Sequence, residues 1–269
     1  MSEILNYSPL DSVVYPEDCD GIPWGQQSGL YIIQPAVGHR LVVNCDMKKS
    51  GGGWTVIQRN TYNSRTNWNV PWENYKRGFG SPQEDHWLGN QPVHLLTSQK
   101  HYKVRFVLQD ASGIEKFADY DSFSLEGELS CFRLRLGQYS GTAGDALTTD
   151  ESHAMHDNMK FSTYDKDNDR SIANCASRAG GGWWYDNCRF ANLNTKTEIY
   201  WQGLCPGNCK STAILIKPSN FCEEDGGAEV ASKGVGCSRG KVPGWYFNSL
   251  LNFAMLVTLT TFSSKIPQY

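Results

Sequence analysis

Nine cysteines constrain this chain of 269 residues more than any other feature. None of them shows the C-x-x-C spacing of a structural zinc site, and so many cysteines are unusual in a cytosolic protein. We therefore expect disulfide bonds formed in an oxidising compartment, and hence a secreted, extracellular protein. Because the number is odd, one thiol is left without an intramolecular partner, and a disulfide-linked homo-oligomer is therefore one possibility. The cysteines are Cys19, Cys45, Cys131, Cys175, Cys188, Cys205, Cys209, Cys222 and Cys237.

Charge and hydropathy exclude two functional classes. The net charge is −3, from 25 Lys and Arg against 28 Asp and Glu, so the chain lacks the basic field that gathers nucleic acid. A mean hydropathy of −0.49 excludes a polytopic membrane protein. The apolar stretch 245–262 is interrupted by polar residues, so membrane attachment is disfavoured. No signal peptide is visible in Met1–Tyr7, although the cysteines predict secretion.

Secondary-structure patterns favour an antiparallel sheet. Runs rich in β-branched and aromatic residues predict strands at 30–34, 41–45, 55–59, 102–108, 117–125 and 132–136. Short helical patterns at 72–79 and 84–97 are expected to brace this sheet. From 137 to 194 the sequence is rich in Gly, Asp and Asn and predicts little regular structure. Long loops of this kind often have a function.

The alternating acids of Asp165–Asp169 are the sharpest candidate site. Three carboxylates at alternate positions repel one another unless a cation joins them, and Ca²⁺ prefers such hard oxygen ligands. An EF-hand is excluded, because its sixth and twelfth loop positions would be Arg170 and Ala176 in place of Gly and Glu. The alternative is a solvated acidic turn, which spacing alone does not exclude.

Aromatic residues lie between two cysteines a little further on. Cys175 and Cys188 bracket Trp183, Trp184 and Tyr185. A disulfide across this short loop would hold the aromatic residues beside the acidic run, with a stabilisation of about 3 kcal/mol. Such aromatic residues suit a shallow recognition pocket, while plain core packing is the alternative.

Candidate catalytic motifs are poor. The pair His153 and His156 lacks a placed third metal ligand and a general base. Ser140 lacks the first glycine of a nucleophile elbow. We therefore expect a protein that is not an enzyme.

A series of motifs resembles one known family. In chain order they are Cys45-Asp46-Met47, Gly51 to Arg59, Trp87-Leu88-Gly89-Asn90, Tyr139 to Asp145, Lys160 to Thr163, Asp165 to Asp169, Asn174-Cys175-Ala176, Trp183-Trp184 and Asn192-Leu193-Asn194. Together they look like a fibrinogen C-terminal (fibrinogen-related) domain, most similar to the fibrinogen-like protein 1 (hepassocin) group, with ficolins and tachylectins more distant. The resemblance covers about residues 15–220, which leaves 1–14 as a leader or linker and 221–269 as a divergent C-terminal tail.

The resemblance implies a globular α+β fold with a central antiparallel sheet, short helices and a loop-rich subdomain for calcium and ligand. It implies the disulfides Cys19–Cys45 and Cys175–Cys188, and a cis peptide before Cys188. By position, Ca²⁺ would be held by the side chains of Asp167 and Asp169 and the carbonyls of Ser171 and Ala173, with Asp165 as an outer charge. Ligand contacts would come from Arg178, Tyr185, Asn187, Cys188 and Arg189.

Several departures from the family pattern concern the ligand surface. Thr195 follows Asn194 where Gly is usual, and about two dozen family residues are missing before 199–201, which shortens one pocket wall. Cys205, Cys209, Cys222 and Cys237 are not cysteines of the family, and Cys131 replaces an aromatic residue. Arg178 and Arg189 lead to a further hypothesis, that the site has shifted toward anionic ligands. Guanidinium groups bind carboxylate, sulfate or phosphate through two hydrogen bonds. The alternative is that both arginines are solvated surface residues.

Two functions are therefore expected for the domain. The first is a secreted, non-enzymatic, calcium-binding recognition domain for glycans or acetylated groups, as in innate-immune lectins. The alternative is a hepassocin-like protein ligand that acts on a cell-surface receptor in growth or immune signalling.

Overall fold

The computed structural model describes residues 14–149 and 154–219. The predicted leader, apart from Val14, and the whole predicted tail lie outside the described residues, so the three-segment division stays a prediction. No helix within the described part of the chain is long and apolar enough to cross a bilayer.

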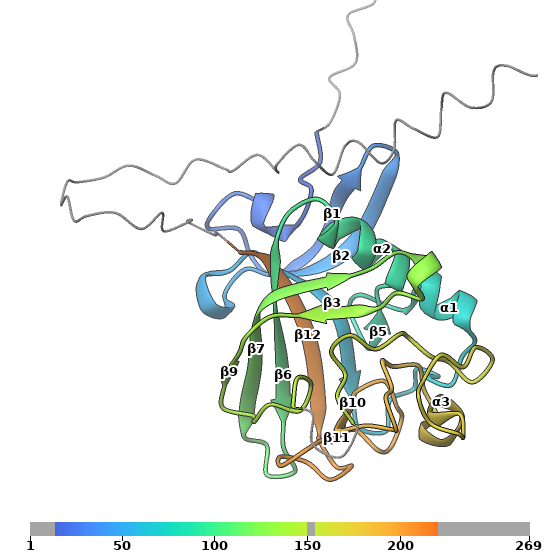
Figure 1. The fold of residues 1–269 in the computed structure, drawn as a ribbon. Coiled ribbons are helices and arrows are strands. Elements are labelled where there is room, and N and C mark those ends of the chain that lie inside the picture. The colour runs from blue at the N-terminus through green and yellow to red at the C-terminus, as the bar shows by residue number, and fades with distance from the viewer. Residues whose placement is uncertain (1–13, 150–153, 220–269) are drawn as a thin grey trace, which may run out of the picture. The chain divides into compact units, whose positions relative to one another are not determined.

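A ten-stranded antiparallel sheet organises the domain (Figure 1). Its main path runs β1-β2-β3-β12-β6-β7-β8, with β4 and β5 attached beside β3 and β9 beside β7. The last strand in sequence therefore lies in the middle of the sheet. The bounds are β1 (Gly29–Ala36), β2 (His39–Asp46), β3 (Trp54–Thr61), β4 (Phe79–Gly80), β5 (His86–Trp87), β6 (Tyr102–Gln109), β7 (Glu115–Leu125), β8 (Leu134–Leu136), β9 (Tyr139–Gly141) and β12 (Ser211–Pro218).

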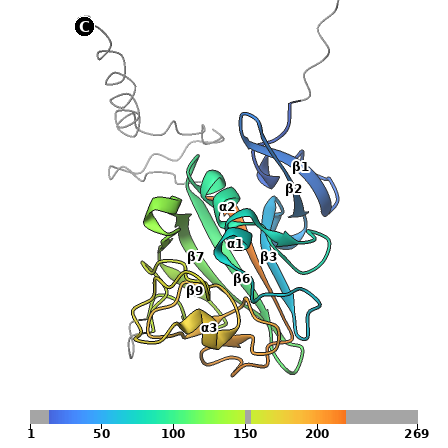
Figure 2. The same ribbon diagram turned by 90° about the vertical axis from the view of Figure 1, so that its right-hand side faces the viewer.

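One face of the sheet carries the main core. Alternate residues of the central strands, such as Ile57, Phe106 and Ile214, are at most 1% exposed and belong to one apolar cluster. The helices α1 (Trp72–Arg77) and α2 (Asn90–Thr97) contribute to the same cluster and stand in front of the strands in Figure 2. The outer face keeps a smaller apolar cluster of Trp54, Val56, Val107 and Leu215. The α+β fold expected from the resemblance is confirmed.

Two element predictions need correction. The helix expected over 84–97 is divided into β5 and α2, because Gly89 has φ 111° and interrupts the backbone path. The strand expected over 132–136 begins only at Leu134, since Cys131 and Phe132 have φ of 53° and 47°, outside the strand region.

The described residues contain three disulfides, one that joins the start of the domain to β2 and two in the loops after β9. Cys19–Cys45 and Cys175–Cys188 are the pairs that the resemblance implied. A third, Cys205–Cys209, was not anticipated; the intervening Pro-Gly-Asn is a turn sequence that could have indicated it. Within the described residues Cys131 is a free thiol, and Cys222 and Cys237 fall outside them.

Three short 3₁₀ helices complete the described elements: η1 (Cys19–Gly21), η2 (Lys49–Gly51) and η3 (Glu128–Ser130).

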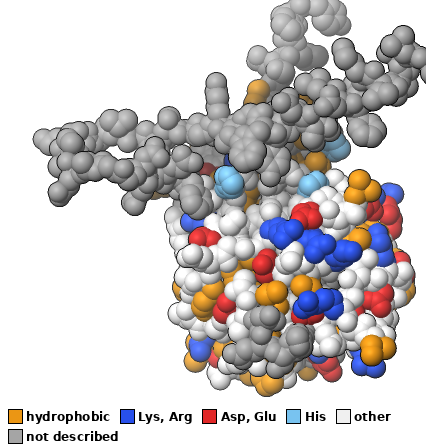
Figure 3. Space-filling model, in the orientation of Figure 1, with side chains coloured by type: hydrophobic (Ala, Val, Ile, Leu, Met, Phe, Trp, Pro, Cys, Tyr) orange, Lys and Arg blue, Asp and Glu red, His pale blue; other side chains and the backbone are white. Residues whose placement is uncertain are grey.

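The surface mixes both signs of charge. On the face in Figure 3, Lys and Arg side chains lie close to Asp and Glu side chains. Glu126, for example, pairs with Arg135 at 2.5 Å and with Arg133 at 3.7 Å. A broad basic field of the kind that binds nucleic acid is not seen on this face.

Candidate calcium and ligand site

The loop-rich part of the domain lies at one end of the sheet (Figure 1). It contains α3 (Cys175–Ala179), β10 (Ala191–Asn192) and β11 (Tyr200–Trp201), joined by turns. Asn174 begins α3 by accepting a hydrogen bond from the Ser177 amide at 2.7 Å. The Cys175–Cys188 bond ties α3 to the loop that precedes β10.

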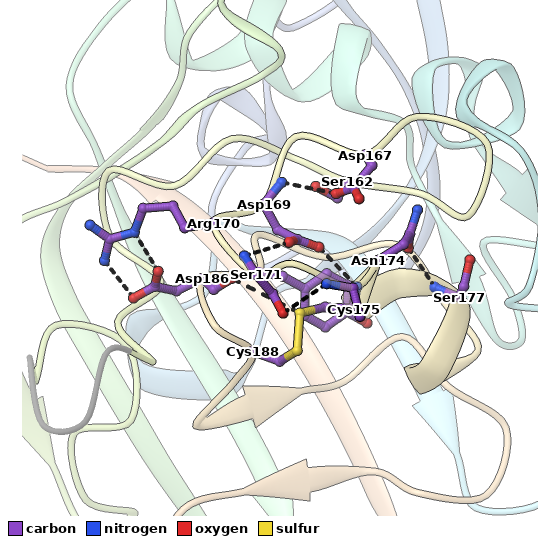
Figure 4. Close-up of a disulfide and its surroundings, with 12 residues drawn as sticks. Ser162, Asp167, Asp169, Arg170, Ser171, Asn174, Cys175, Ser177, Asp186 and Cys188 are labelled. Carbon is purple, nitrogen blue, oxygen red and sulfur yellow. Dashed lines mark hydrogen bonds and ion pairs between the residues drawn. A yellow bond between two sulfur atoms is a disulfide. The ribbon is translucent and has the colours of Figure 1, made fainter.

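The structure brings the two predicted acidic calcium ligands together (Figure 4). The Asp167 carboxylate accepts a hydrogen bond from the Asp169 amide at 3.2 Å. The Asp169 carboxylate accepts one from the Ser171 amide and one from the Cys175 amide, both at 2.9 Å. The backbone therefore curls around Asp169 and holds it beside Asp167.

Asp167 and Asp169 are two like charges held side by side. Partial burial, and then the neighbouring Asp167 charge, raise the pKa of Asp169 despite its amide hydrogen bonds. Among the described residues no Lys, Arg or His forms an ion pair with either carboxylate. Two acids held close without a counter-charge favour the binding of a cation.

The predicted carbonyl ligands are compatible with that role. Within the described ranges no hydrogen bond reaches the carbonyl oxygen of Ser171 or Ala173. The same part of the chain contains no group of three or more His, Cys, Asp and Glu side chains placed to hold a metal. The donor set is thus two carboxylates and backbone oxygens, which fits a hard ion such as Ca²⁺ and not a transition metal.

Asp165 has a different local task. Its carboxylate accepts hydrogen bonds from the Trp72 amide at 2.9 Å and the Thr163 hydroxyl at 2.7 Å. Trp72 is the first residue of α1, so Asp165 satisfies an amide that the helix itself leaves free. No local pattern predicts this contact, because 93 residues separate the two partners.

An ion pair between an exposed arginine and a buried acid adjoins the acidic loop. The Asp186 side chain is fully buried, and both its oxygens bind the Arg170 guanidinium, at 2.5 and 2.6 Å (Figure 4). Such a two-point contact fixes geometry as well as charge. It joins the residue after Asp169 to the residue two before Cys188, and the sequence analysis did not single out either partner.

The five predicted ligand residues are divided between surface and core. Arg178 and Asn187 are exposed, and the Asn187–Cys188 peptide is cis, as the resemblance implied. Arg189 pairs with Glu198 at 3.3 Å and lies over the Tyr200 ring, 5.8 Å from its centroid.

Tyr185, the remaining ligand prediction, is fully buried together with its two tryptophan neighbours. Trp183, Trp184 and Tyr185 are at most 1% exposed. The Trp184 indole donates to the Phe132 carbonyl at 2.8 Å, and the Tyr185 hydroxyl donates to the Gly181 carbonyl at 2.8 Å. The recognition pocket expected from these aromatic residues is therefore not formed by them. Core packing is what the structure shows, because large rings gain most from burial.

Two amide side chains of β3 hold the segment next to the shortened region. Gln58 donates to the Leu193 carbonyl at 3.0 Å, and Asn60 donates to the carbonyls of Leu193 and Thr195 at 2.8 and 2.7 Å. All four residues are buried. The chain therefore stays attached to the sheet up to Thr195, and the departure from the family pattern begins after that anchor.

Comparison with known proteins agrees with this geometry. Residues 15–214 match the family described as fibrinogen beta and gamma chains, C-terminal globular domain. A fibrinogen-like protein 1-like protein of Gallus gallus is 49% identical over 72% of this chain and 70% of its own length. Techylectin-5A of Tachypleus tridentatus is 43% identical over 66% of this chain and 62% of its own length.

The solved structures include a lamprey fibrin D-dimer complexed with the peptide ligand Gly-His-Arg-Pro-amide. It is 30% identical, with a TM-score of 0.70, and the match covers 84% of this chain and 80% of that one. Some relatives are much longer, since the match covers only 55% of human fibroleukin and 32% of bovine angiopoietin-4. The extent of the sequence match and the shared fold show that this chain belongs to the fibrinogen C-terminal domain family.

Proposed function

We propose that this domain is an extracellular, non-enzymatic recognition module that binds Ca²⁺ at its acidic loop and a ligand on the adjoining surface. The observation that carries the proposal is the Asp167 and Asp169 pair: two carboxylates are held together without an ion pair, beside two carbonyls that accept no hydrogen bond, as far as the described residues go. A bound Ca²⁺ would supply the missing positive charge and link the carboxylates to the carbonyls of Ser171 and Ala173.

The surface next to this loop favours an anionic ligand. Arg178 is exposed in the last turn of α3, and the described residues give it no ion-pair partner. Arg189 lies just beyond the Cys175–Cys188 bond, with its charge partly balanced by the exposed Glu198. Sulfated or sialylated glycans carry the carboxylate or sulfate groups that guanidinium forks bind. The name of the related Techylectin-5A is in keeping with a glycan ligand.

A second candidate function is a protein ligand for a cell-surface receptor, of the hepassocin type. The observation that favours it is the 49% identity to the Gallus gallus fibrinogen-like protein 1-like protein over most of the domain. In that case the binding face need not include the calcium loop, and metal removal would leave receptor binding intact.

Calcium binding is tested by titration and thermal melting of protein from an oxidising host, with Asp167→Ala as the variant. Asp167 is exposed, and its carboxylate accepts only a local hydrogen bond from the Asp169 amide within the described residues, so we expect its loss to leave the fold in place. We expect saturable binding and a raised Tm in the parent, and neither in the variant. If the unsubstituted protein binds no Ca²⁺, the proposal is wrong.

Ligand class is tested by presenting the same protein to sulfated and sialylated glycans, with and without EDTA. Binding that disappears with EDTA and with Arg178→Ala plus Arg189→Ala supports the anionic-glycan function. Binding that survives both changes contradicts it. Cell-surface binding that persists in EDTA, without glycan binding, favours the protein-ligand function.

A further inference from the structure

The hairpin of β1 and β2 exposes apolar side chains that the core does not use. Leu30, Ile32 and Val42 are 40%, 44% and 50% exposed. Ile32 is paired directly with Val42 in the ladder, and Leu30 is two residues before Ile32, so the three share the outer face. Figure 2 shows this hairpin at the margin of the domain, away from the loop-rich region. A contiguous exposed apolar patch of this kind usually marks a contact surface.

β1 is also an open edge of the sheet. It is the first strand in the order, with a neighbour on one side only. The Gln34 amide points away from β2, since it donates to the Pro16 carbonyl at 2.7 Å. Alternation along a strand turns the backbone groups of Leu30 and Ile32 the same way. In the described parts of the chain nothing pairs with these outward groups.

The charge pattern of this edge suits a second copy of the same chain. β1 reads Gly-Leu-Tyr-Ile-Ile-Gln-Pro-Ala and contains no charged residue. Natural edge strands normally carry a Lys, or another charge, that blocks pairing with a neighbour. In a two-fold pairing the residues closest to the axis lie near their own copies, so a charge there would repel its copy. An uncharged edge avoids this cost.

We propose that β1 pairs antiparallel with β1 of a second copy and joins two sheets across a two-fold axis. The register follows from the backbone. Gln34 is already bonded to Pro16 and Pro35 has no amide hydrogen, so the free groups are those of Leu30 and Ile32. Leu30 therefore pairs with Ile32 of the second copy, Ile32 with its Leu30, and Tyr31 lies opposite its own copy on the axis.

The size of the edge predicts a reversible dimer. Pairing involves only the residues from Gly29 to Gln34 and the side chain of Val42 behind them. This is less than the roughly 800 Å² per partner of a standard stable interface. Since the contact is apolar and made of backbone hydrogen bonds, added salt will not weaken the dimer, unlike a dimer held by ion pairs.

Sedimentation of the full chain over about a hundredfold range of concentration tests the dimer. We expect a monomer–dimer equilibrium that is insensitive to salt. Ile32→Lys places a charge at the self-pairing edge and should shift the chain to monomer. The matched control is Val37→Lys, because Val37 is 94% exposed in the turn between β1 and β2 and outside the pairing. A parent that stays monomeric throughout, or equal dimerisation of both variants, overturns the proposal.

A cysteine on the two-fold axis tests the register. Facing residues at a non-hydrogen-bonded antiparallel pair have Cα atoms about 4.5 Å apart, within reach of a disulfide. Tyr31→Cys should therefore oxidise to a dimer linked through residue 31 of both copies, identified by mass spectrometry of the linked peptide. Val37→Cys, oxidised in parallel, should not link through residue 37. Failure of Tyr31→Cys to form this link, in a variant that melts cooperatively, contradicts the register.

Discussion

His156 is the residue whose chemistry depends most on the fold. Its ring is fully buried, with Nδ1 2.7 Å from the Trp184 carbonyl. Nε2 faces the amides of Phe190 and Ala191 at 3.0 and 2.9 Å. Because both amides are donors, Nε2 must be the unprotonated acceptor and Nδ1 must carry the hydrogen. From its spacing, His156 was considered only as a metal ligand. In the structure it links its own segment to Trp184 and to Phe190 and Ala191.

Burial lowers the pKa of His156 to about 4. In the unfolded chain the histidine pKa is near 6.5. Below pH 6.5 the unfolded state therefore binds a proton at His156 that the folded state does not bind. Stability is therefore full above pH 6.5 and is lost as the pH falls toward 4, by about 3 kcal/mol at most. Denaturant unfolding between pH 7.5 and 4 measures this slope. His156→Gln should be less stable at neutral pH and should show a shallower slope, and an unchanged slope would contradict the assignment.

Several residue contacts were beyond prediction from sequence. Gln58 and Asn60 bind backbone carbonyls more than 130 positions away, and no local pattern links such partners. The Arg170 and Asp186 pair is 16 residues apart, yet nothing in the spacing distinguishes these two charges from their solvated neighbours. The resemblance supplied the disulfide pairs and the cis peptide, which residue spacing alone left open.

At the scale of elements, strands were easier to predict than the places where they break. The runs 30–34, 41–45 and 55–59 fall inside β1, β2 and β3, since β-branched residues on alternate faces specify a strand locally. The interruptions depend on single backbone conformations, as at Gly89 and at Cys131, whose φ is 53°. A left-handed non-glycine residue is held by tertiary contacts, so a local pattern does not reveal it.

The beginning of α1 separates the roles of two acids in the calcium loop. Asp165 binds the first amide of α1, while Asp167 is free to bind a metal. Asp165→Ala should lower stability by about 1 kcal/mol, as the loss of a helix cap does, and it should do so even in EDTA. Asp167→Ala should melt like the parent in EDTA.

The change in Tm with Ca²⁺ should rank the two variants in the opposite order. If the domain binds calcium as proposed, Asp165→Ala should keep the expected rise in Tm with calcium, and Asp167→Ala should lose it. Thermal melts of both variants with calcium and with EDTA make the measurement. Loss of the calcium response in Asp165→Ala would contradict this division of roles and would show that the outer charge which the resemblance implied for Asp165 is needed for metal binding.

At the scale of the whole molecule, the central position of β12 decides how the chain folds. β12 pairs with β3 on one side and β6 on the other, although more than 100 residues separate it from either. Sequence patterns indicated the longer strands before it, but neither β12 itself nor the order of the strands in the sheet, because order depends on long-range pairing. The N-terminal strands therefore cannot complete their sheet until the end of the domain has been made.

Truncation on either side of β12 tests this dependence. A chain that ends at Lys210 lacks Ile214, Leu215 and Ile216, which are at most 3% exposed. Their burial contributes about 5 kcal/mol or more, comparable with the whole stability of a typical domain, roughly 5–15 kcal/mol. We expect this chain to lose cooperative melting and near-UV circular dichroism. A chain that ends at Ser219 keeps β12 and should retain both. Cooperative melting of the shorter chain would show that the other nine strands of the main sheet are stable without β12.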